Sequence, residues 1–497
     1  MLLASILGSS MAFIDGTVVN LALPALQSTL HATAADVQWV VESYALCLAA
    51  LLLLGGALGD RLGRRRVFAI GTALFAAASA ACGLAPTIEW LIAARAIQGV
   101  GAALLVPGSL ALISATVAPD RRGRAIGTWS AWAAATAGVG PVLGGWLIQA
   151  ASWRWLFWLN LPIATGTLAV TLSKVPESRA PGAGGGLDWL GAALATAGLG
   201  GLVFGLIEAP QRGLGDPLII AGLAGGALLL AGFLMAEARI SCPMVPLELF
   251  RSRTFAGTNL LTLFLYAALG GAFFFLPFDL IQVRRYSPLE AGAAMLPFIL
   301  LMFALSRVAG RLVDRYGARI PLIVGPLIAG VGFGLLGMSG KDGSYWTTLF
   351  PGIVLLGIGM AVSVAPLTTA VMGAVAQEHA GLASGINNAV SRAAGLLAVA
   401  IFGAVATLRF GSGLTRRLAE LQVPSGVRQL LASEESRLAG ATLPPSLPHE
   451  LRTMLRAAID LSFVEAFQLV MLLAAALAVA GSVSAWGMIE PKGGKGR

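Results

Sequence analysis

The sequence predicts an all-α protein that crosses a membrane many times. Hydrophobic residues make up 57% of its 497 residues, charged residues make up 11%, and the mean hydropathy is +0.83. A soluble protein of this length needs far more charge to cover its surface. The apolar residues also gather into stretches of about 20 residues, the length that one helix needs to cross a bilayer. The soluble, disordered, collagen-like and disulfide-rich classes are therefore excluded.

The distribution of charge and of cysteine indicates which molecules the protein is expected to bind. The net charge of +9 comes largely from short runs of arginine between apolar stretches. That pattern is typical of membrane topology, whereas a protein that binds nucleic acid has a clustered basic face. The three cysteines lie far apart and have no metal-ligand or redox spacing. We expect the lipid bilayer as a partner, and no nucleic acid, no metal and no cofactor.

Fourteen apolar segments are long enough to span the membrane. They run roughly over 2–26, 37–59, 67–85, 88–112, 125–150, 155–174, 187–208, 217–236, 255–282, 288–312, 319–339, 345–374, 383–408 and 461–487. An even number of spans places both termini on the same side of the membrane.

The positions of the arginines indicate on which side of the membrane the termini lie. Short cytoplasmic loops carry an excess of Lys and Arg. Here the arginines concentrate in the loops after the second, fourth and tenth segments, as Arg61, Arg64, Arg65, Arg66, Arg121, Arg122, Arg124, Arg307, Arg311, Arg315 and Arg319. We predict a multi-pass protein of the cell membrane with both termini in the cytoplasm. The connection 409–460 is expected to be an outside loop despite its seven arginines, because long loops cross largely regardless of charge.

The chain repeats part of itself. Five residues recur 254 positions later, pairing Gly56 with Gly310, Asp60 with Asp314, Arg61 with Arg315, Gly63 with Gly317, and Arg65 with Arg319. Two halves in parallel repeat are a known plan of transporters. We predict an N-terminal six-helix half over 1–174, two inserted helices with linkers over 175–254, a C-terminal six-helix half over 255–487 and a cytoplasmic tail over 488–497.

Six motifs occur in order along these segments. They cover 15–24, 56–66, 95–101, 140–145, 153–162 and 383–388. Together they make the chain resemble the fourteen-helix drug:proton antiporter branch of the major facilitator superfamily over nearly its whole length. The resemblance implies the major facilitator fold, with two six-helix halves plus two inserted helices.

The resemblance also implies roles for two groups of residues. The residues expected to act in conformational gating are Gly56, Asp60, Arg61, Gly63, Asp314 and Arg315. The residues that match the antiporter motif of the fifth helix are Gly140, Pro141, Gly144 and Gly145. Glycines permit tight turns and close helix approach, and proline removes one backbone hydrogen bond. For Asp60 with Arg61 we expect a gating latch, since topology alone needs no buried carboxylate. The alternatives are that the arginines only fix topology and that Pro141 only kinks the helix.

Three charged residues inside the predicted spans are candidates for proton coupling. Asp15 lies well inside the hydrocarbon core, where a carboxylate is costly unless it is protonated, paired or hydrated. Arg95, near the middle of the fourth segment, needs a partner, and either Asp15 or Glu42 is available. Glu42 stands where related sequences often carry a smaller polar residue or an aspartate, which suggests a second proton or cation site. The alternative is that these residues only join neighbouring helices.

Two further charges are possible substrate or coupling residues. Asp279 lies five residues before Arg284, so an ion pair at the outer interface is the preferred interpretation. Arg392 matches an arginine of the family, and packing cannot be separated from coupling there. Glu290 with Ser287 and Pro288 predicts only a helix-capping box.

The favoured function is proton-coupled antiport that exports a hydrophobic or amphipathic small molecule, with cationic compounds included. The sequence has no Walker lysine motif that would use ATP and no nucleophile–base pair of an enzyme, and the protein is expected to be a monomer. On the same fold, the alternatives are a proton-coupled importer and an exporter dedicated to one natural product. From a different class, the alternative is a non-transporting receptor or scaffold.

Overall fold

A computed structural model of the chain describes residues 1–117, 119–179, 187–240 and 243–491. The side chains of some residues within its helices also lie outside this description, among them those of Arg122, Arg124, Arg307 and Asp314. The glycine-rich stretch 182–186, expected to precede the inserted helices, lies outside the described residues as well.

The described chain is helical almost throughout. In order, its elements are α1 Leu2–Thr29, α2 Ala34–Leu62, α3 Arg64–Gly83, α4 Ile88–Thr116, α5 Pro119–Ala150, α6 Arg154–Trp158, α7 Asn160–Lys174, α8 Trp189–Arg212, α9 Pro217–Glu237, η1 Leu247–Arg251, α10 Arg253–Phe278, η2 Asp279–Val283, α11 Pro288–Ala294, α12 Leu296–Tyr316, α13 Arg319–Gly337, α14 Tyr345–Thr348, α15 Phe350–Gly373, η3 Gln377–His379, α16 Ala380–Glu420, α17 Ser425–Glu434, η4 Glu435–Gly440 and α18 His449–Met488.

The predicted all-α fold is confirmed. Within the described residues, thirteen helical segments are long and apolar enough to cross a membrane. The remaining predicted segment coincides with α5, part of which lies outside the described residues. Several spans are made of two consecutive helices, such as α6 with α7 and α11 with α12. Each of the fourteen predicted segments is therefore occupied by helix.

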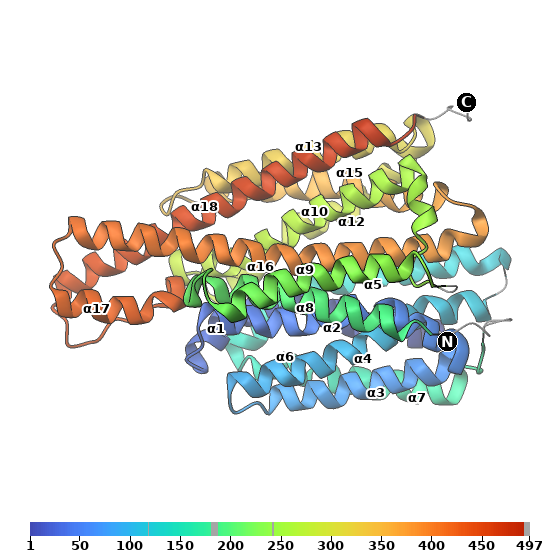
Figure 1. The fold of residues 1–497 in the computed structure, drawn as a ribbon, viewed down its shortest axis with the longest axis horizontal. Helices are drawn as coiled ribbons and strands as arrows, with labels where there is room; N and C mark the ends of the chain where they lie inside the picture. Colours follow the sequence, from blue (N-terminus) through green and yellow to red (C-terminus); the bar gives the residue numbers. More distant parts are fainter. Residues whose placement is uncertain (118, 180–186, 241–242, 492–497) are drawn as a thin grey trace.

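The helices form two groups (Figure 1). In the first group, α1 to α7, both α2 and α3 pack against α4. In the second group, α10 to α18, α13 packs against α15 and α18, while α10 packs against α16 and α18. In Figure 1 the first group lies below, in blue to cyan, and the second lies above, in yellow to red. We refer to them as the first and second helix groups.

The two ends of the bundle differ. In Figure 1, α1 begins and α18 ends on the right, and α17 lies on the left. The α2–α3 turn lies on the right as well, because α2 returns from the left-hand end of α1. We call the right-hand end the basic-loop end, after Arg64, Arg65 and Arg66, and the left-hand end the α17 end.

The two basic turns of the repeat share one backbone feature. Helix α2 ends at Leu62 and α12 ends at Tyr316, and each is followed by a glycine with a positive φ, 116° at Gly63 and 73° at Gly317. Glycine takes this conformation without the strain that a Cβ atom would add. The repeat that is visible in the sequence therefore corresponds to two equivalent turns, one in each helix group.

Helices α8 and α9 form a hairpin outside the two groups. Helix α8 packs on both α2 and α16, and α9 packs chiefly on α8. At the α17 end, the indole Nε1 of Trp39 donates a hydrogen bond of 3.3 Å to Glu208 Oε1 of α8. The hairpin thus lies along the line where the first group meets the second. Its described residues line neither of the two cavities described below.

The connection 409–460 differs from the predicted loop because most of it is helical. Helix α16 has 41 residues and α18 has 40, so each is about 60 Å long, twice the thickness of the hydrocarbon core. They project beyond the other helices at the α17 end and are joined there by α17 (Figure 1). The sequence rule finds only the apolar part of each helix and gives no signal for a polar continuation.

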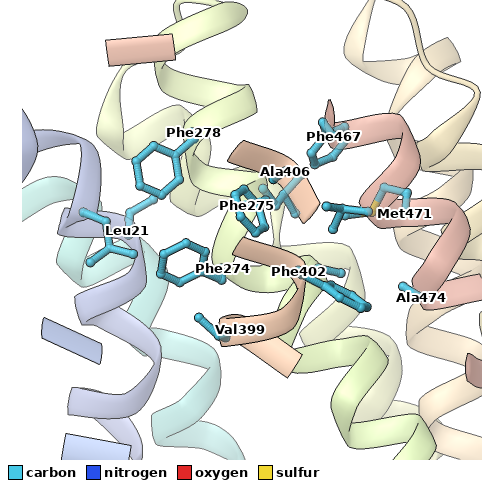
Figure 2. Close-up of a cluster of buried hydrophobic side chains, with 14 of the residues drawn as sticks. Leu21, Phe274, Phe275, Phe278, Val399, Phe402, Ala406, Phe467, Met471 and Ala474 are labelled. Carbon is cyan, nitrogen blue, oxygen red and sulfur yellow. The ribbon is translucent and has the colours of Figure 1, made fainter. Parts of the chain in front are cut away.

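Phenylalanine fills the space between the two groups near the α17 end (Figure 2). Phe274 and Phe278 of α10 face Leu21 of α1, while Phe275 faces α16. All of these side chains are buried in one apolar cluster. Leu21 is therefore packed against the second group although it belongs to the first.

Glycine substitutions in α2 test the close packing of α2 on α4. A Cβ atom at Gly55 would lie 2.0 Å from the carbonyl oxygen of Ala103, whereas one at Gly59 would have no atom within 4 Å. We expect Gly55→Ala to destabilise the protein by about 1–3 kcal/mol through overpacking, and Gly59→Ala to be neutral or slightly stabilising. Thermal unfolding of the two purified variants in the same detergent measures this difference. Equal midpoints would contradict the described packing.

Candidate functional site

The centre of the first helix group holds a buried ion pair between Asp15 of α1 and Arg95 of α4. Arg95 Nη1 donates to Asp15 Oδ2 at 2.6 Å, and the side chains of Arg95 and Asp15 are 2% and 0% exposed. Burying two charges costs several kcal/mol per ion unless their attraction and further hydrogen bonds offset it. Of the two partners that the sequence left open for Arg95, the structure therefore selects Asp15.

Neutral polar side chains complete this pair. Gln98 donates from Nε2 to Asp15 Oδ1 at 3.0 Å and accepts from Arg95 Nη1 at 2.7 Å. Gln98 also donates to the hydroxyl of Ser79, which receives a second bond from Asn160. The network joins α1, α3, α4 and α7. Low local polarity strengthens each of these bonds, so the network fixes the relative position of four helices.

Helix α2 covers the arginine. Arg95 Nε donates to the carbonyl oxygen of Val40 at 3.1 Å, and the guanidinium lies 4.2 Å from the ring centroid of Tyr44. A cation over an aromatic face is attracted by the ring's quadrupole. The Tyr44 hydroxyl has no hydrogen-bond partner among the described residues. The charge of Arg95 is therefore held by α1 on one side and by α2 on the other.

Glu42 stands apart from this network. Its side chain is fully buried, and neither carboxyl oxygen has a hydrogen-bond partner among the described residues. An unpaired buried carboxylate is far more costly than a neutral carboxyl group. We therefore expect Glu42 to be protonated in this conformation. The sequence grouped Glu42 with Asp15 and Arg95, but the structure brings only the latter two together.

A cavity of 820 Å³ lies between the two helix groups. Its wall comes from α1, α5, α10, η2, α11, α12 and α15 and is largely apolar. It includes aromatic and thioether side chains such as those of Phe273, Phe298 and Met302. Among the described lining residues, Thr17 and Asn20 are the polar ones and none is charged. The Thr17 hydroxyl bonds to the backbone of its own helix, which leaves the Asn20 amide available to a ligand.

The glycines of α5 bring three helices together beside this cavity. A Cβ atom at Gly140 would lie 2.5 Å from Thr17 Oγ1, and one at Gly144 would lie 2.6 Å from Val18 Cγ1, both on α1. Gly145 faces the second group instead, since its Cβ would lie 2.3 Å from the carbonyl oxygen of Pro288. Pro141 lines the cavity. The predicted antiporter motif thus packs α5 against α1 and against the start of α11.

The basic turn is built differently from the predicted latch. Asp60 accepts a hydrogen bond of 2.9 Å from Arg64 Nε, and its side chain is 42% exposed. The expectation of a buried carboxylate is therefore wrong. Asp60 pairs with Arg64 because the turn at Gly63 brings the first residue of α3 back over the last turn of α2. A Cβ atom at Gly56 would be in ordinary contact with Pro107, 3.6 Å away.

Glu177 supports this turn and was not identified from the sequence. Its carboxylate accepts hydrogen bonds from the backbone N–H groups of Arg65 at 3.0 Å and Arg66 at 3.3 Å. These are unsatisfied donors of the first turn of α3, where a negative charge is also favoured by the helix dipole. A side chain at Gly63 would collide with this carboxylate, since a Cβ there would lie 2.6 Å from it.

The equivalent turn in the second group is less fully described. Arg315 is exposed and its guanidinium lies 5.2 Å from the ring centroid of Tyr316. A Cβ atom at Gly310 would have no atom within 4 Å. The side chain of Asp314, the predicted counterpart of Asp60, lies outside the described residues.

Asp279 and Arg392 occupy two different environments. Asp279 is fully buried and accepts a bond of 2.6 Å from Arg284 Nε, which confirms the predicted pair. Arg392 is half-buried in α16, with no hydrogen bond or ion pair among the described residues. It lies within electrostatic reach of the hydroxyl groups of Tyr44 and Tyr266. The predicted capping box of Ser287 and Glu290 is confirmed.

The described residues contain no group of three or more His, Cys, Asp and Glu side chains that is placed to hold a metal ion. A bundle of spanning helices in two groups, with an apolar cavity between them and a buried ion pair beside it, defines a membrane transporter. Its similarity to known proteins identifies the family of transporters.

The chain belongs to the Major Facilitator Superfamily, whose sequence profile it matches over residues 5–399. It is 35% identical to the tetracenomycin C resistance and export protein of Streptomyces glaucescens, over 97% of this chain and 90% of that protein. It is 37% identical to the multidrug resistance protein Stp of Mycobacterium tuberculosis, over 87% and 80%. It is also 37% identical to the puromycin resistance protein of Streptomyces alboniger, over 79% of each chain.

Solved structures show the same fold. A bacterial homologue of the lysosomal transporter Spinster, in an inward-facing and occupied conformation, superposes with a TM-score of 0.65 at 17% identity, over 98% of this chain and 95% of that chain. A D-xylose–proton symporter superposes with a TM-score of 0.64 at 15% identity, over 100% and 99%. The fold is therefore that of major facilitator transporters.

Glu177 provides a test of the basic turn. Removing its carboxylate with Glu177→Ala leaves the backbone N–H groups of Arg65 and Arg66 without acceptors, so we expect the turn to open more often. Trypsin should then cut after Arg64–Arg66 several-fold faster than in the unaltered protein. Ser178→Ala, at the next residue, is the matched control, because the Ser178 hydroxyl has no hydrogen-bond partner among the described residues. Unchanged cleavage in Glu177→Ala would show that the carboxylate does not hold the turn.

Proposed function

We propose that this protein exports hydrophobic or amphipathic small molecules from the cell in exchange for protons. The apolar cavity of 820 Å³ carries this proposal, since its volume lies within the range of about 300–1,000 Å³ found for ligand pockets. Aromatic and thioether side chains adapt to ligands of different shape. The resistance and export functions in the names of its relatives support the same direction of transport.

Asp15 and Arg95 are proposed to couple the proton to this movement. In the described conformation the pair is closed, and Arg95 gives the Asp15 carboxylate a counter-charge at 2.6 Å. Gly16 and Thr17, the next two residues of α1, line the cavity. A movement of α1 that separates Asp15 from Arg95 would favour protonation of the carboxylate. Proton affinity would then differ between the two states of the carrier, which is what coupling requires. Glu42 is proposed as a second site that exchanges its proton when α2 moves.

The described conformation is closed at the α17 end. There Gly145 touches the backbone of Pro288, and Gln282 of η2 donates a bond of 2.8 Å to Gln27 Oε1 of α1. These contacts join the first group to the second. If the basic-loop end faces the cytoplasm, as the arginines favour, this conformation receives substrate from the cell interior. Gly56, Asp60, Arg61, Gly63, Asp314 and Arg315 are proposed to control the reverse movement at that end.

The domain division is proposed to follow the helix groups. The halves 1–174 and 255–487 would rock against each other, and the insert 175–254 would lie outside the transport path, since its described residues line neither cavity. The cavity is formed within one chain, which supports a monomer as the functional unit. The cell membrane, with both termini in the cytoplasm, is the proposed location.

Inverted vesicles test the proposed function directly. The chain is expressed in an efflux-deficient host, a pH gradient is imposed across inverted membranes, and release of protons is followed when a hydrophobic drug is added. Drug-dependent proton release that is absent from vesicles without the chain supports antiport. Drug uptake that proceeds unchanged after the gradient is collapsed would contradict it.

Neutralising Asp15 tests the coupling role. We expect Asp15→Asn to abolish drug-dependent proton release, because a permanently neutral residue binds no exchangeable proton, and Glu42→Gln to cause a smaller or substrate-dependent loss. Since Asp15→Asn leaves the Arg95 charge buried without a counter-charge, the double variant Asp15→Asn/Arg95→Gln is measured beside it, with thermal unfolding as the check on folding. Proton release like that of the unaltered protein in either folded variant would move coupling elsewhere, with Glu42 as the next residue to examine.

Asp60→Asn tests the basic turn during transport. It removes the charge that accepts from Arg64 while keeping the volume of the side chain. We expect the rate of drug transport to fall several-fold more than the amount of protein in the membrane, which immunoblotting quantifies. Equal losses of transport and of protein would favour a purely structural role for Asp60.

A further inference from the structure

A second cavity, of 960 Å³, lies at the α17 end between α1 of the first group and η2, η4 and α18 of the second. Four of its lining residues carry a positive charge, Arg285, Lys341, Arg452 and Arg456, and Asp460 is the one acid among the described lining residues. We call this space the α17-end pocket. Its charge is the opposite of what a binding site for cationic drugs requires.

One carboxylate is shared by three of these cations. Asp460 is 5% exposed and lies 3.0 Å from Arg456, 3.3 Å from Arg285 and 3.7 Å from Lys341. Arg456 is in addition held by the carbonyl oxygens of Gln282, Ala439 and Ala441, which makes it part of the pocket's framework. One negative charge cannot balance three positive ones, so a positive excess remains in the pocket.

The fourth cation increases this excess. The half-buried side chain of Arg452 has no hydrogen bond or ion pair among the described residues. A nearby acid, Glu434, is occupied by Arg437 and by Thr442, from which it accepts bonds of 3.0 and 2.9 Å. Although partial burial raises it, these bonds leave the pKa of Glu434 below its ordinary value, so the group is ionised but engaged. The described pocket therefore holds more arginine and lysine donors than its one carboxylate can neutralise.

The pocket adjoins the central cavity. Leu21 lines both spaces, and the neighbours Leu280 and Ile281 line one each. The two cavities are therefore separated by a thin apolar wall that joins α1 to η2. In an exporter that opens at the α17 end to release its substrate, a ligand leaving the central cavity past Leu21 enters the positive pocket next.

We propose that the α17-end pocket binds the acidic group, a carboxylate, sulfonate or phosphate, of an amphipathic aromatic substrate on its way out. This proposal rests on the proposed export function and specifies its substrate class as neutral or anionic aromatic compounds. It replaces the cationic class that the sequence had suggested, since the described wall of the central cavity holds no acid. Arginine is suited to this role, because its planar donors match an oxyanion.

Three probes with one aromatic body test the charge preference: 1-pyrenebutyrate, 1-pyrenebutanol and 1-pyrenebutylammonium. Equilibrium binding to the purified protein, without any gradient, reports on the site itself. Each charge-assisted hydrogen bond is worth about 1.5–3 kcal/mol, so we expect the double variant Lys341→Gln/Arg452→Gln to bind pyrenebutyrate roughly tenfold or more weakly. Pyrenebutanol binding should be unchanged. Arg212→Gln, an exposed arginine on α8 outside the pocket, is the matched control.

Transport of the same probes separates this inference from the proposed function. With a pH gradient across inverted vesicles, we expect pyrenebutyrate and pyrenebutanol to be transported and pyrenebutylammonium to be excluded. If the double variant weakens pyrenebutyrate binding but no probe is transported, the export function fails while the anion site stands. If the double variant binds pyrenebutyrate as tightly as the unaltered protein, the anion site is overturned.

A lipid headgroup offers the same anionic chemistry and is distinguished by composition. The binding measurement is repeated in nanodiscs of phosphatidylcholine alone and in nanodiscs that also hold phosphatidylglycerol. We expect similar pyrenebutyrate affinities in both. Loss of pyrenebutyrate binding in the phosphatidylglycerol discs, with its recovery on removal of that lipid, would identify the pocket as a lipid site and overturn its assignment to the substrate.

Discussion

The ion pair between Asp15 and Arg95 is the interaction on which the first helix group depends. The two charges are almost completely buried, and burial of charge is tolerated only where further polar partners are present. Here Gln98, the Val40 carbonyl oxygen and the ring face of Tyr44 contact the parts of the Arg95 guanidinium that Asp15 does not. The same partners position α1, α2 and α4. A change in the protonation of Asp15 therefore alters a contact that holds three helices, and the network converts a local charge into a constraint on helix position.

Close helix packing supplies the second constraint. Helices in a bilayer gain little from the hydrophobic effect between them and rely on tight packing of small residues. Gly140 and Gly144 bring α5 onto α1, and Gly145 brings it onto α11 across the boundary between the groups. Helix α1 is thus held by α4 through charge and by α5 through shape. Its movement requires both contacts to change together.

The sequence predicted the positions of the helices better than the side-chain contacts between them. Hydropathy located every span because the bilayer imposes one length, and Gly63 and Gly317 marked the turns because the backbone there has a positive φ. Helix rotation decides which side chains meet, and composition carries no signal for it. Hence Arg95 had two possible partners, the particular arginine that pairs with Asp60 was not predicted, and Glu177, more than a hundred residues from the turn it supports, was missed. The polar extensions of α16 and α18 were not predicted as helix, because the criterion for a membrane span counts apolar residues alone.

The order of side chains along α1 explains why the Asp15 carboxylate and a substrate in the central cavity need not be in contact. Successive residues of a helix point about 100° apart, so Asp15 faces α4 while Gly16, Asn20 and Leu21 face the cavities. A proton site inside the cavity would attract cations and expose a charge to every ligand. With the carboxylate on the other side of the helix, the described cavity wall stays apolar, and proton binding at Asp15 would be linked to substrate binding through the position of α1. The acid proposed to couple transport and the surface proposed to select the substrate are therefore free to differ in chemistry while they share one helix.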